Sequence, residues 1–497
     1  MFENFFKRYR KSPSPTLPTF FNTLSKHTEQ FDLPPHAHTV RMYNCGPTVY
    51  GTQHIGNLSM FVFTDVVRHI LEYNGFAVKQ VINITDFGHL SGDNMGDADT
   101  GEDRMTKGLK REGMKVSMEN MRTLGERYTQ IFFEDIQKLH IDTTRIEFPR
   151  ASMYIKAQIA MIETLVEKGY AYQTAGGVYY DTTQFADYGR LGAINLEGLQ
   201  EGARVTTNKE KRNPFDFVLW KSDKKIGWDS PWGLGFPGWH IECSAMIRAT
   251  LGQQIDIHTG GIEHIPIHHN NEIAQSEAAT GKKPLSRFWI HRAHIQIDGG
   301  KIAKSAGTAI FLSDVLERGY HPLALRYLFL GAHYRTSANF SWKALDAAQT
   351  AFAKLVAIGL HFHDIKPSEP PQLWKARFLE RINDDVDTPG ALAVVWEMVK
   401  DKSLQPEALL AGLYDFDRVL GLGLTQPDEA AQTLARNELK EEVPLSETQS
   451  EVRQLFAKRE IARKGRSWAA ADKLRSQIEA LGFTVEDSST ETRIFKK

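Results

Sequence analysis

The clearest alternation of apolar and polar positions lies between residues 39 and 86. A short β-prone run, TVRMYNCG, ends at Gly46-Pro47, and IGNLSMFVFTDVVRHILEYNG then repeats apolar residues at helical spacing up to Gly75. Glycine in that place is typical of a helix end, and AVKQVINITD after it has the apolar run of a buried strand. A strand, a helix and a strand of these lengths predict a right-handed βαβ unit that begins a doubly wound parallel sheet.

Beyond this unit the pattern predicts an excursion, an insertion and a return to the sheet. Residues 88–108 are acidic and glycine-rich without the spacing of a calcium loop, so we expect a solvated excursion. Helical periodicity continues to about residue 169. The runs YAYQ, GVYYDT and FDFVLW then predict short strands of a mixed insertion between 170 and 220. GWHIECSAMIRATLG predicts a helix and QIDIHTGG a strand where the chain re-enters the sheet domain.

The C-terminal third predicts helices followed by a small domain. Residues 320 to 436 are almost purely helical in pattern, and the charged segment 437–450, interrupted by Pro444, predicts a linker. The end predicts helices and a terminal hairpin of FTVED and RIF. The expected fold is a Rossmann-type α/β catalytic domain with an α+β insertion, a helical bundle and a small C-terminal domain. The expected ranges are 1–146 with 234–290 (catalytic), 147–233 (insertion), 291–345 (connecting region), 320–440 (overlapping bundle) and 446–497 (C-terminal).

Composition restricts the class of protein. The chain has 497 residues, of which 41% are hydrophobic and 24% charged, which is typical of several globular domains and excludes disordered, collagen-like and disulfide-stapled proteins. It lacks a long apolar run, and no apolar stretch follows the basic N-terminal cluster, so we expect neither a membrane span nor a secretory signal. The formal net charge of −1 means that a nucleic-acid partner must be sought in local patches.

The two cysteines and one histidine-rich stretch are candidates for a metal site. Without an export signal, Cys45 and Cys243 are expected to be free thiols in a reducing compartment, either buried and inert or available to a metal. In IPIHHNNEIAQSE, a helix would place Glu272 on one face with His268 four residues before it and with His269 three residues before it. Spacing leaves the choice of histidine open, and a polar surface or satisfied core feature is the plainer interpretation.

Two further motifs suit the binding of phosphates. The loop CGPTVYGTQHIGN connects the end of a strand to a helix N-terminus, where free N–H groups and the helix dipole attract anions, and it carries His54 and Asn57. Far downstream, DGGKIAKSAGT places Lys301 and Lys304 on a glycine-flanked loop that suits cations closing over a polyphosphate. Helix capping by Asn57 and Thr52, and a solvated lysine turn, are the structural alternatives.

These motifs together resemble a known family. The H-I-G-N and K-I-A-K-S loops resemble the two signatures of class I aminoacyl-tRNA synthetases. The stretches MYNCGPTVYGTQHIGN, SPWGLGFPGWHIECSAM and DIHTGG…HHNNEIAQSE narrow the resemblance to the cysteinyl-tRNA synthetase family. HPLALRYLFLGAHYRTSANFSW and AAADKLRSQIEALGFTVED look similar to its helical and C-terminal parts, so the resemblance covers the chain from about residue 18 to its end.

The resemblance implies an activity and its cofactors. The expected reaction is the ATP-dependent ligation of L-cysteine to tRNA(Cys) through cysteinyl-adenylate, with release of AMP and pyrophosphate, by a cytoplasmic monomer. Mg²⁺ is expected with ATP, and one zinc ion per chain would bind the substrate thiol. A thiol-binding metal suits this task, because an apolar pocket cannot strongly reject serine and zinc prefers sulfur.

The resemblance also assigns residues to roles. The residues it implies for zinc are Cys45, Cys243, His268 and Glu272, which selects His268 over His269; those for ATP are His54, Gly56, Asn57, Lys301 and Lys304; those for the cysteine pocket are Thr85, Trp239 and His258. Trp239 could instead be an ordinary core or rim residue.

The chain departs from the family pattern at three places. Asn57 replaces the second histidine of His-Ile-Gly-His and loses any cationic form, and Ile302 and Ala303 replace Met and Ser of Lys-Met-Ser-Lys-Ser. After Asp86 the usual acids and lysine are replaced by Phe-Gly-His and the acidic excursion.

The C-terminal segment has its own candidates for contacts with RNA. Basic residues outnumber acidic ones in 449–497, and four of them, Arg459, Arg463, Lys464 and Arg466, precede Trp468. Such a helix can contact phosphates while its indole stacks on an unpaired base, unless the tryptophan lies in a core.

Three other functions fit parts of the sequence. A relative that joins cysteine to an amino sugar lacks the C-terminal tRNA-binding part. A nucleotidyltransferase needs neither the metal set nor the lysine loop. A non-enzymatic RNA-binding protein leaves the ATP and substrate motifs without a role.

Overall fold

The computed structural model describes most of the chain, namely residues 17–34, 37–87, 104–192, 210–297, 300–301, 309–438, 441–487 and 492–496. Most of the acidic excursion and much of the lysine loop, including Lys304, lie outside these ranges. The chain divides into two compact units, one of Met1–Ala348 with Pro367–Leu422 and one of Gln349–Lys366 with Gly423–Lys497. None of the helices in the described ranges combines the length and apolar character that a membrane crossing requires.

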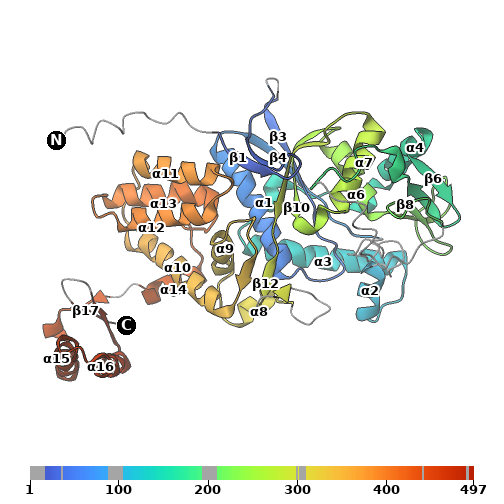
Figure 1. Ribbon diagram of the computed structural model, residues 1–497. Coiled ribbons are helices and arrows are strands. Elements are labelled where there is room, and N and C mark those ends of the chain that lie inside the picture. Colours follow the sequence, from blue (N-terminus) through green and yellow to red (C-terminus); the bar gives the residue numbers. More distant parts are fainter. Residues whose placement is uncertain are drawn as a thin grey trace, which may run out of the picture. The chain divides into compact units, whose positions relative to one another are not determined.

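A five-stranded parallel sheet forms the centre of the first unit (Figure 1). Its order, β5-β4-β3-β10-β11, is the 3-2-1-4-5 order of a doubly wound nucleotide-binding sheet. Helix α1 (Ile55–Tyr73) connects β3 to β4, which confirms the predicted βαβ unit. The strands are β3 (Thr39–Asn44), β4 (Ala77–Ile82), β5 (Ile146–Glu147), β10 (Ile255–Gly261) and β11 (Ser286–Arg292).

Helices cover both faces of this sheet, because both faces are apolar. Successive residues of a strand point to opposite faces, so Val81 of β4 joins one core cluster and Ile82 the other. Helices α1 and α3 pack with Ile82, and α4, α6 and α7 pack with Val81 (Figure 1). The bounds of these covering helices and of α2 are α2 (Arg104–Arg111), α3 (Met118–Lys138), α4 (Ile155–Glu167), α6 (Trp239–Thr250) and α7 (His268–Thr280).

The predicted insertion is a four-stranded antiparallel sheet of order β6-β7-β8-β9. Its first three strands coincide with the runs YAYQ, GVYYDT and FDFVLW. The fourth was not predicted, because its three residues include a glycine and a proline, which are uncommon within strands. The strands are β6 (Ala171–Thr174), β7 (Gly177–Tyr180), β8 (Phe217–Ser222) and β9 (Gly235–Pro237). The insertion thus leads directly into the N-terminus of α6.

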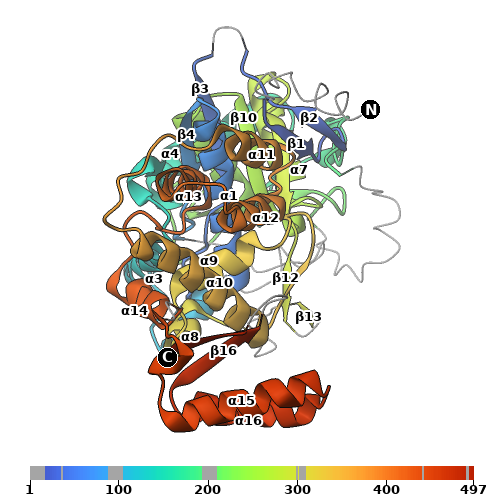
Figure 2. The same ribbon diagram turned by 90° about the vertical axis from the view of Figure 1, so that its left-hand side faces the viewer.

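The remainder of the first unit is mainly helical, as predicted, with short strands between the helices. Helices α11, α12 and α13 pack against one another (Figures 1 and 2). The helices are α8 (Leu312–Glu317), α9 (Pro322–Leu330), α11 (Gln372–Asn383), α12 (Thr388–Lys400) and α13 (Pro406–Leu420), and α10 (Trp342–His361) continues into the second unit. The short strands are β1 (Thr19–Asn22), β2 (His27–Gln30), β12 (Ile295–Ile297), β13 (Gly300–Lys301) and β14 (Ala338–Phe340).

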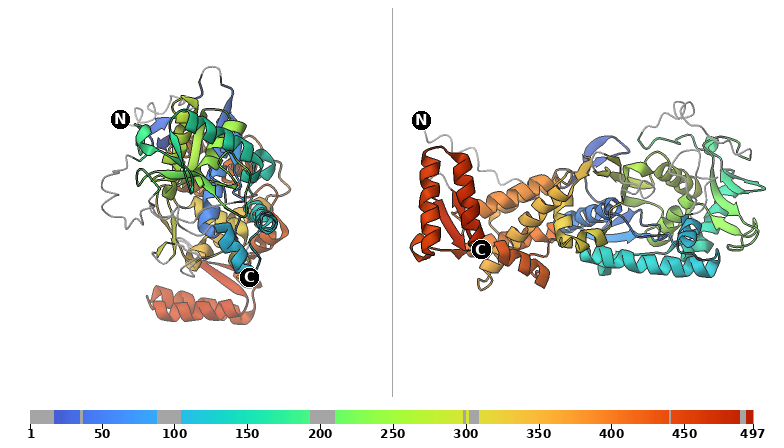
Figure 3. Two further views of the ribbon diagram at one scale, coloured as in Figure 1. Left: turned by 90° about the vertical axis from the view of Figure 1, so that its right-hand side faces the viewer. Right: turned by 90° about the horizontal axis from the view of Figure 1, so that it is seen from below.

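The second unit contains a helical pair and a three-stranded antiparallel sheet. Figure 3 shows α15 and α16 side by side in red. The predicted terminal hairpin is confirmed by the pairing of β16 with β17. The prediction of a plain linker over 437–450 is wrong, because β15 lies within it and pairs with β17. The elements are α14 (Glu429–Glu438), β15 (Glu441–Glu442), α15 (Ser450–Lys464), α16 (Trp468–Ala480), β16 (Phe483–Asp487) and β17 (Thr492–Lys496).

Candidate active site

The four candidate metal ligands come together from three separate segments. Cys45 directly follows β3, Cys243 lies in α6, and His268 and Glu272 lie one turn apart in α7. Their ligand atoms all lie within 4.8 Å of one another, and all four side chains are buried. Zinc bound at about 2.0–2.3 Å by sulfur, nitrogen and oxygen ligands needs donor atoms this close together. The donor set therefore fits a zinc ion.

A second, overlapping set shares two of these ligands. Cys45, His258, His269 and Glu272 also place their ligand atoms within 4.8 Å of one another. His269 Nε2 lies 3.2 Å from the Cys45 sulfur, whereas His268 Nε2 lies 2.6 Å from Glu272 Oε1. The other carboxylate oxygen of Glu272 lies 2.7 Å from His258 Nε2. His268 and His269 thus belong to different ligand sets. The structure therefore does not decide which of these two histidines binds a metal, which the sequence spacing had also left open.

The electrostatics of the cluster favour the charged forms of Cys243 and Glu272 but not that of Cys45. A hydrogen bond with Cys45 lowers the pKa of Cys243 to about 6, whereas burial raises the pKa of Cys45. Burial opposes the charged form of Glu272, but the imidazoles of His258 and His268 outweigh it and lower the pKa of that carboxyl. Metal ligands must be deprotonated before they bind. Cys243 and Glu272 meet that condition, whereas Cys45 and His268, whose pKa Glu272 raises to about 9 against the effect of burial, would have to lose a proton to the solvent when a metal binds.

The residues expected to form a cysteine pocket lie against this cluster. The Trp239 ring is centred 4.3 Å from the ring of His268. The hydroxyl of Thr85 donates a hydrogen bond of 3.0 Å to Glu242, the neighbour of Cys243 in α6. His258 is fully buried and contacts Glu272. Trp239 and His258 therefore contact ligands of the set directly, whereas Thr85 is connected to it through Glu242.

The loop that begins at Cys45 ends at the N-terminus of α1, where the phosphate motif lies. His54 is the N-cap of this helix, and its Nδ1 accepts a hydrogen bond of 3.2 Å from the Asn57 amide. The side-chain amide of Asn57 donates to Gln53 instead, at 2.7 Å. The sequence had also allowed Asn57 and Thr52 to cap this helix. The helix is capped instead by His54, and neither Asn57 nor Thr52 is its N-cap. Gly56 lies in the first turn.

Both ends of the lysine loop have defined anchors. Lys301 belongs to β13 and pairs with Gln296 of β12, while Lys304 lies outside the described residues. On the C-terminal side of the loop, the Ile310 carbonyl accepts a hydrogen bond of 2.8 Å from the Ile55 amide. The loop therefore returns to the first residue of α1, beside His54, so the two motifs belong to one region of the molecule.

Comparison with known proteins identifies the family. A family model described as "tRNA synthetases class I (C) catalytic domain" matches residues 32–350, and one described as "Cysteinyl-tRNA ligase anticodon binding domain" matches residues 445–494. The chain is 43% identical over 481 residues to cysteine–tRNA ligase 1 of Burkholderia lata, with 96% of each chain covered. This chain belongs to the cysteine–tRNA ligase family. It is therefore an enzyme of the aminoacyl-tRNA synthetase class of ligases.

Other relatives agree with this assignment. The chain is 37% identical to the cysteine–tRNA ligase of Treponema denticola, over 95% of this chain and 98% of that one. Among solved structures, Mycobacterium tuberculosis methionyl-tRNA synthetase bound by methionyl-adenylate has a TM-score of 0.52 at 13% identity, covering 80% of this chain and 93% of that chain. At so low an identity the likeness supports the fold alone, which is the expected Rossmann-type class I architecture.

The C-terminal module of this cysteine–tRNA ligase family member separates the predicted RNA-contacting residues into two groups. Arg459 is buried at 3% exposure and forms an ion pair with Asp487 at 2.5 Å, so the prediction that it contacts phosphates is wrong. Arg463 also pairs with Asp487. Lys464 is exposed, and the Trp468 indole, which could have lain in a core, is 59% exposed at the start of α16.

Further buried histidines contact the two candidate ligands His268 and His269, and one of them, His291, was not identified from the sequence. His240 Nδ1 lies 2.9 Å from His268 Nδ1, and His269 Nδ1 lies 2.7 Å from His291 Nε2. Burial lowers the pKa of His240, His269 and His291, so these rings are neutral. The concentration of histidines between 240 and 291 was a usable signal, but periodicity could not show that they all face one cluster.

Proposed function

We propose that this chain charges tRNA(Cys) with L-cysteine in two steps at one site. The carboxylate of cysteine attacks the α-phosphate of ATP, which gives cysteinyl-adenylate and pyrophosphate. The 3′-terminal ribose hydroxyl of the tRNA then takes the cysteinyl group and releases AMP. Family membership supports the overall reaction. We propose further that the chain acts as a cytoplasmic monomer, with Mg²⁺ accompanying ATP.

Selection of the substrate is assigned to the buried ligand set of Cys45, Cys243, His268 and Glu272. A zinc ion held there would bind the thiol of cysteine and discriminate it from the hydroxyl of serine. Glu272 is the ligand best able to weaken its bond to zinc when the substrate thiol binds, because its carboxylate already has a second partner in His258. Trp239 and Thr85 are proposed to enclose the substrate beside the sulfur. The convergence of these four ligands is the observation that carries the proposal.

Binding and activation of ATP are assigned to the two phosphate motifs. His54, Gly56 and Asn57 occupy the N-terminus of α1, where backbone N–H groups favour phosphate oxygens. Lys301 and Lys304 are proposed to close over the phosphates and to balance the charge that gathers on the leaving pyrophosphate. The hydrogen bond between Ile310 and Ile55 supports this arrangement, because it returns the lysine loop to the same helix end.

The proposal is tested by cysteine-dependent exchange of labelled pyrophosphate into ATP, with serine as the alternative substrate. Exchange is expected with cysteine and not with serine, and prolonged dialysis against a zinc chelator is expected to abolish it until zinc is restored. The chelated protein is compared with an undialysed sample by circular dichroism, so that unfolding is recognised. Equal exchange with serine, or full activity without any transition metal, would contradict the role assigned to the metal.

Recognition of tRNA is assigned to the module at residues 445–494, with Trp468 as a stacking platform. Trp468→Ala is expected to weaken tRNA binding by roughly 5- to 150-fold, because stacking of a base on an aromatic ring contributes about 1–3 kcal/mol. Exchange of pyrophosphate with cysteine should stay unchanged. The measurement is the KM for tRNA in the charging reaction, with Leu373→Ala, also an exposed apolar residue, as the control. An unchanged KM in the Trp468 variant would remove the indole from the interface.

The match at residues 445–494 also bears on the alternatives. A ligase that joins cysteine to an amino sugar would have no use for an anticodon-binding module, so the observation favours tRNA as the acceptor.

A further inference from the structure

Arg292, the last residue of β11, is a buried cation without a carboxylate partner among the described residues. It is 6% exposed, and its Nε donates a hydrogen bond of 3.1 Å to the Ser59 hydroxyl. The other buried arginines of the described chain do have carboxylate partners: Arg68 and Arg326 both pair with Asp65, as Arg459 does with Asp487. Because a buried charge without a counterion is costly, a neutralising group beside the guanidinium of Arg292 would be favourable.

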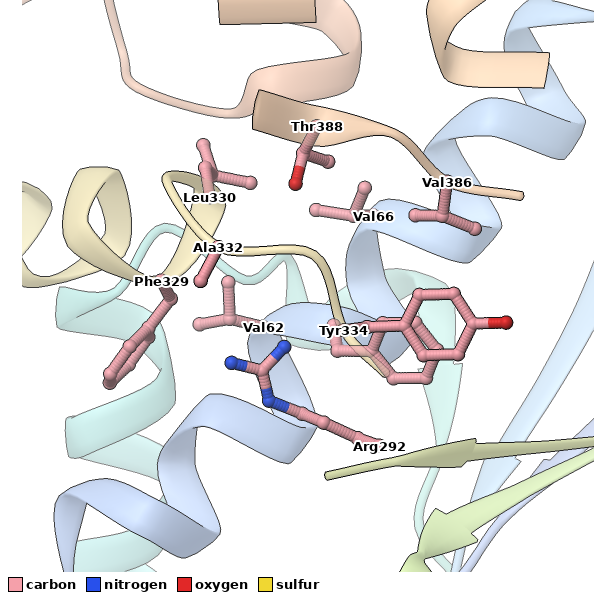
Figure 4. Close-up of a pocket in the computed structure, with 10 residues that line it drawn as sticks. Val62, Val66, Arg292, Phe329, Leu330, Ala332, Tyr334, Val386 and Thr388 are labelled. Atoms are coloured by element: carbon pink, nitrogen blue, oxygen red, sulfur yellow. The ribbon is translucent and has the colours of Figure 1, made fainter. Parts of the chain in front are cut away.

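The guanidinium of Arg292 reaches into a small cavity of the first unit. Figure 4 shows its terminal nitrogens among Val62, Phe329 and Ala332, and the hydroxyl oxygen of Thr388 directed toward the same space. The volume is about 10 Å³, which is the room of one water-sized particle. The residues that line the cavity are Val62, Phe63, Val66, Arg292, Phe329, Leu330, Ala332, Tyr334, Val386 and Thr388, and none of them is acidic.

The turn that closes the cavity is strained, and its acidic residue is already engaged. Asp385 and Val386 adopt φ values of 51° and 60°, which are costly for residues with side chains, most of all for a β-branched valine. Asp385 accepts hydrogen bonds from the Tyr334 hydroxyl at 2.5 Å and from Arg335 Nε at 2.7 Å. Its carboxylate thus serves other donors, and the strained turn presents Val386 to the cavity in its place.

We propose that Arg292 binds one small monovalent anion of the size of chloride in this cavity, with the Thr388 hydroxyl facing the same ion. A monatomic anion fits this small space best, because phosphate, sulfate and carboxylates have several heavy atoms and need more room. The charge favours an anion over water, since guanidinium stays protonated in proteins. Burial lowers the pKa of Arg292 only to about 10, so the cation persists at neutral pH.

The position of the cavity indicates what the anion would do. Its walls come from α1, from the end of α9, from β11 and from the turn before α12, so the ion would join the parallel sheet to the helices that follow it. Arg292 has no assigned part in the reaction, because none of the residues assigned to cysteine or ATP lines the cavity. The anion is therefore expected to stabilise the fold of the first unit and to leave the chemistry unchanged.

The first test is thermal unfolding of the full-length protein in sodium chloride against sodium gluconate at constant ionic strength. Chloride is expected to raise Tm by roughly 1–3 °C once its concentration is about ten times Kd, and Tm should continue to rise with the logarithm of the chloride concentration. Arg292→Met keeps the length of the side chain and should show the same Tm in both salts. Arg248→Met, at an exposed position of α6, should retain the chloride effect. Equal Tm values for the unsubstituted protein in the two salts would overturn the proposal.

The second test needs no variant and so does not depend on how Arg292→Met folds. Crystals of the full-length protein grown in sodium bromide should give an anomalous peak beside the Arg292 guanidinium, because bromide replaces chloride and scatters anomalously. The peak is expected within about 3.5 Å of a guanidinium nitrogen. An ordered water with no anomalous signal, or a bromide that binds only elsewhere, would show that the cavity holds water and would sink the assignment.

Discussion

Substitution of Cys243 by alanine is expected to remove the bound zinc and to lower cysteine-dependent pyrophosphate exchange by about 10³-fold or more. The thiolate is one of the four proposed ligands, and it is the thiol whose charge the site favours, because a hydrogen bond with Cys45 lowers its pKa to about 6. Binding through a metal contributes several kcal/mol to a reaction, and each 1.4 kcal/mol is a factor of ten. Zinc content by elemental analysis and the exchange rate together measure the effect.

Met246→Leu is the matched control for this substitution. Met246 lies one turn further along α6, is fully buried, and belongs to the core cluster beside the site. Leucine has nearly the same volume, so zinc content and exchange should stay close to those of the unsubstituted protein. If Cys243→Ala kept one zinc per chain and a normal exchange rate, α6 would have no part in the metal site.

Two histidine variants decide between the overlapping ligand sets. With the ion held by Cys45, Cys243, His268 and Glu272, His268→Ala should lose zinc and His269→Ala should retain it. The reverse result, together with retention in Cys243→Ala, would place the ion with His258 and His269. Because Cys45 and Glu272 belong to both sets, variants of those two residues cannot separate the sets.

The elements that the sequence predicted are those with a long, uniform environment. Helix α1 repeats apolar residues over five turns and ends at a glycine, so its pattern predicts both its existence and its end. Strands β5, β9 and β14 were missed because they have only two or three residues, and their identity comes from pairing with neighbours. Periodicity cannot reveal a strand that contains little more than one two-residue repeat of the pattern.

In the candidate site, likewise, the sequence indicated residues that lie in recognisable motifs, but not the contacts that only the fold creates. Resemblance indicated Cys45 and Cys243, and folding brings them together through a parallel sheet whose strand order places β3 beside β10. His291, which lies against His269, was not identified, since it looks like any polar residue at the end of a strand. Arg459 was assigned to RNA because its charge is visible in the sequence, whereas its partner Asp487 is supplied by the terminal hairpin.

Lys304→Ala is expected to slow cysteine-dependent pyrophosphate exchange by about 10²- to 10³-fold, with little change in the KM for cysteine. The ammonium group is proposed to stabilise charge that develops on the leaving pyrophosphate, and loss of one such donor has an effect of this size. A group that acts mainly in the transition state lowers kcat without weakening the binding of the amino acid. The hydrogen bond between Ile310 and Ile55 fixes the residue that follows the loop beside the N-terminus of α1, where the phosphates are proposed to bind. Rates at saturating cysteine and ATP measure the effect.

Two further variants separate charge from shape in this prediction. Lys304→Arg keeps the positive charge and should recover part of the lost rate, although the planar guanidinium cannot occupy the same point. Lys343→Ala removes an exposed lysine at the start of α10 and should change nothing, which controls for the net charge of the protein. Zinc content should be normal in all three variants. A Lys304→Ala protein that exchanges pyrophosphate at the normal rate would show that the lysine loop does not act on ATP, and the phosphates would then have to be neutralised by His54 and Mg²⁺ alone.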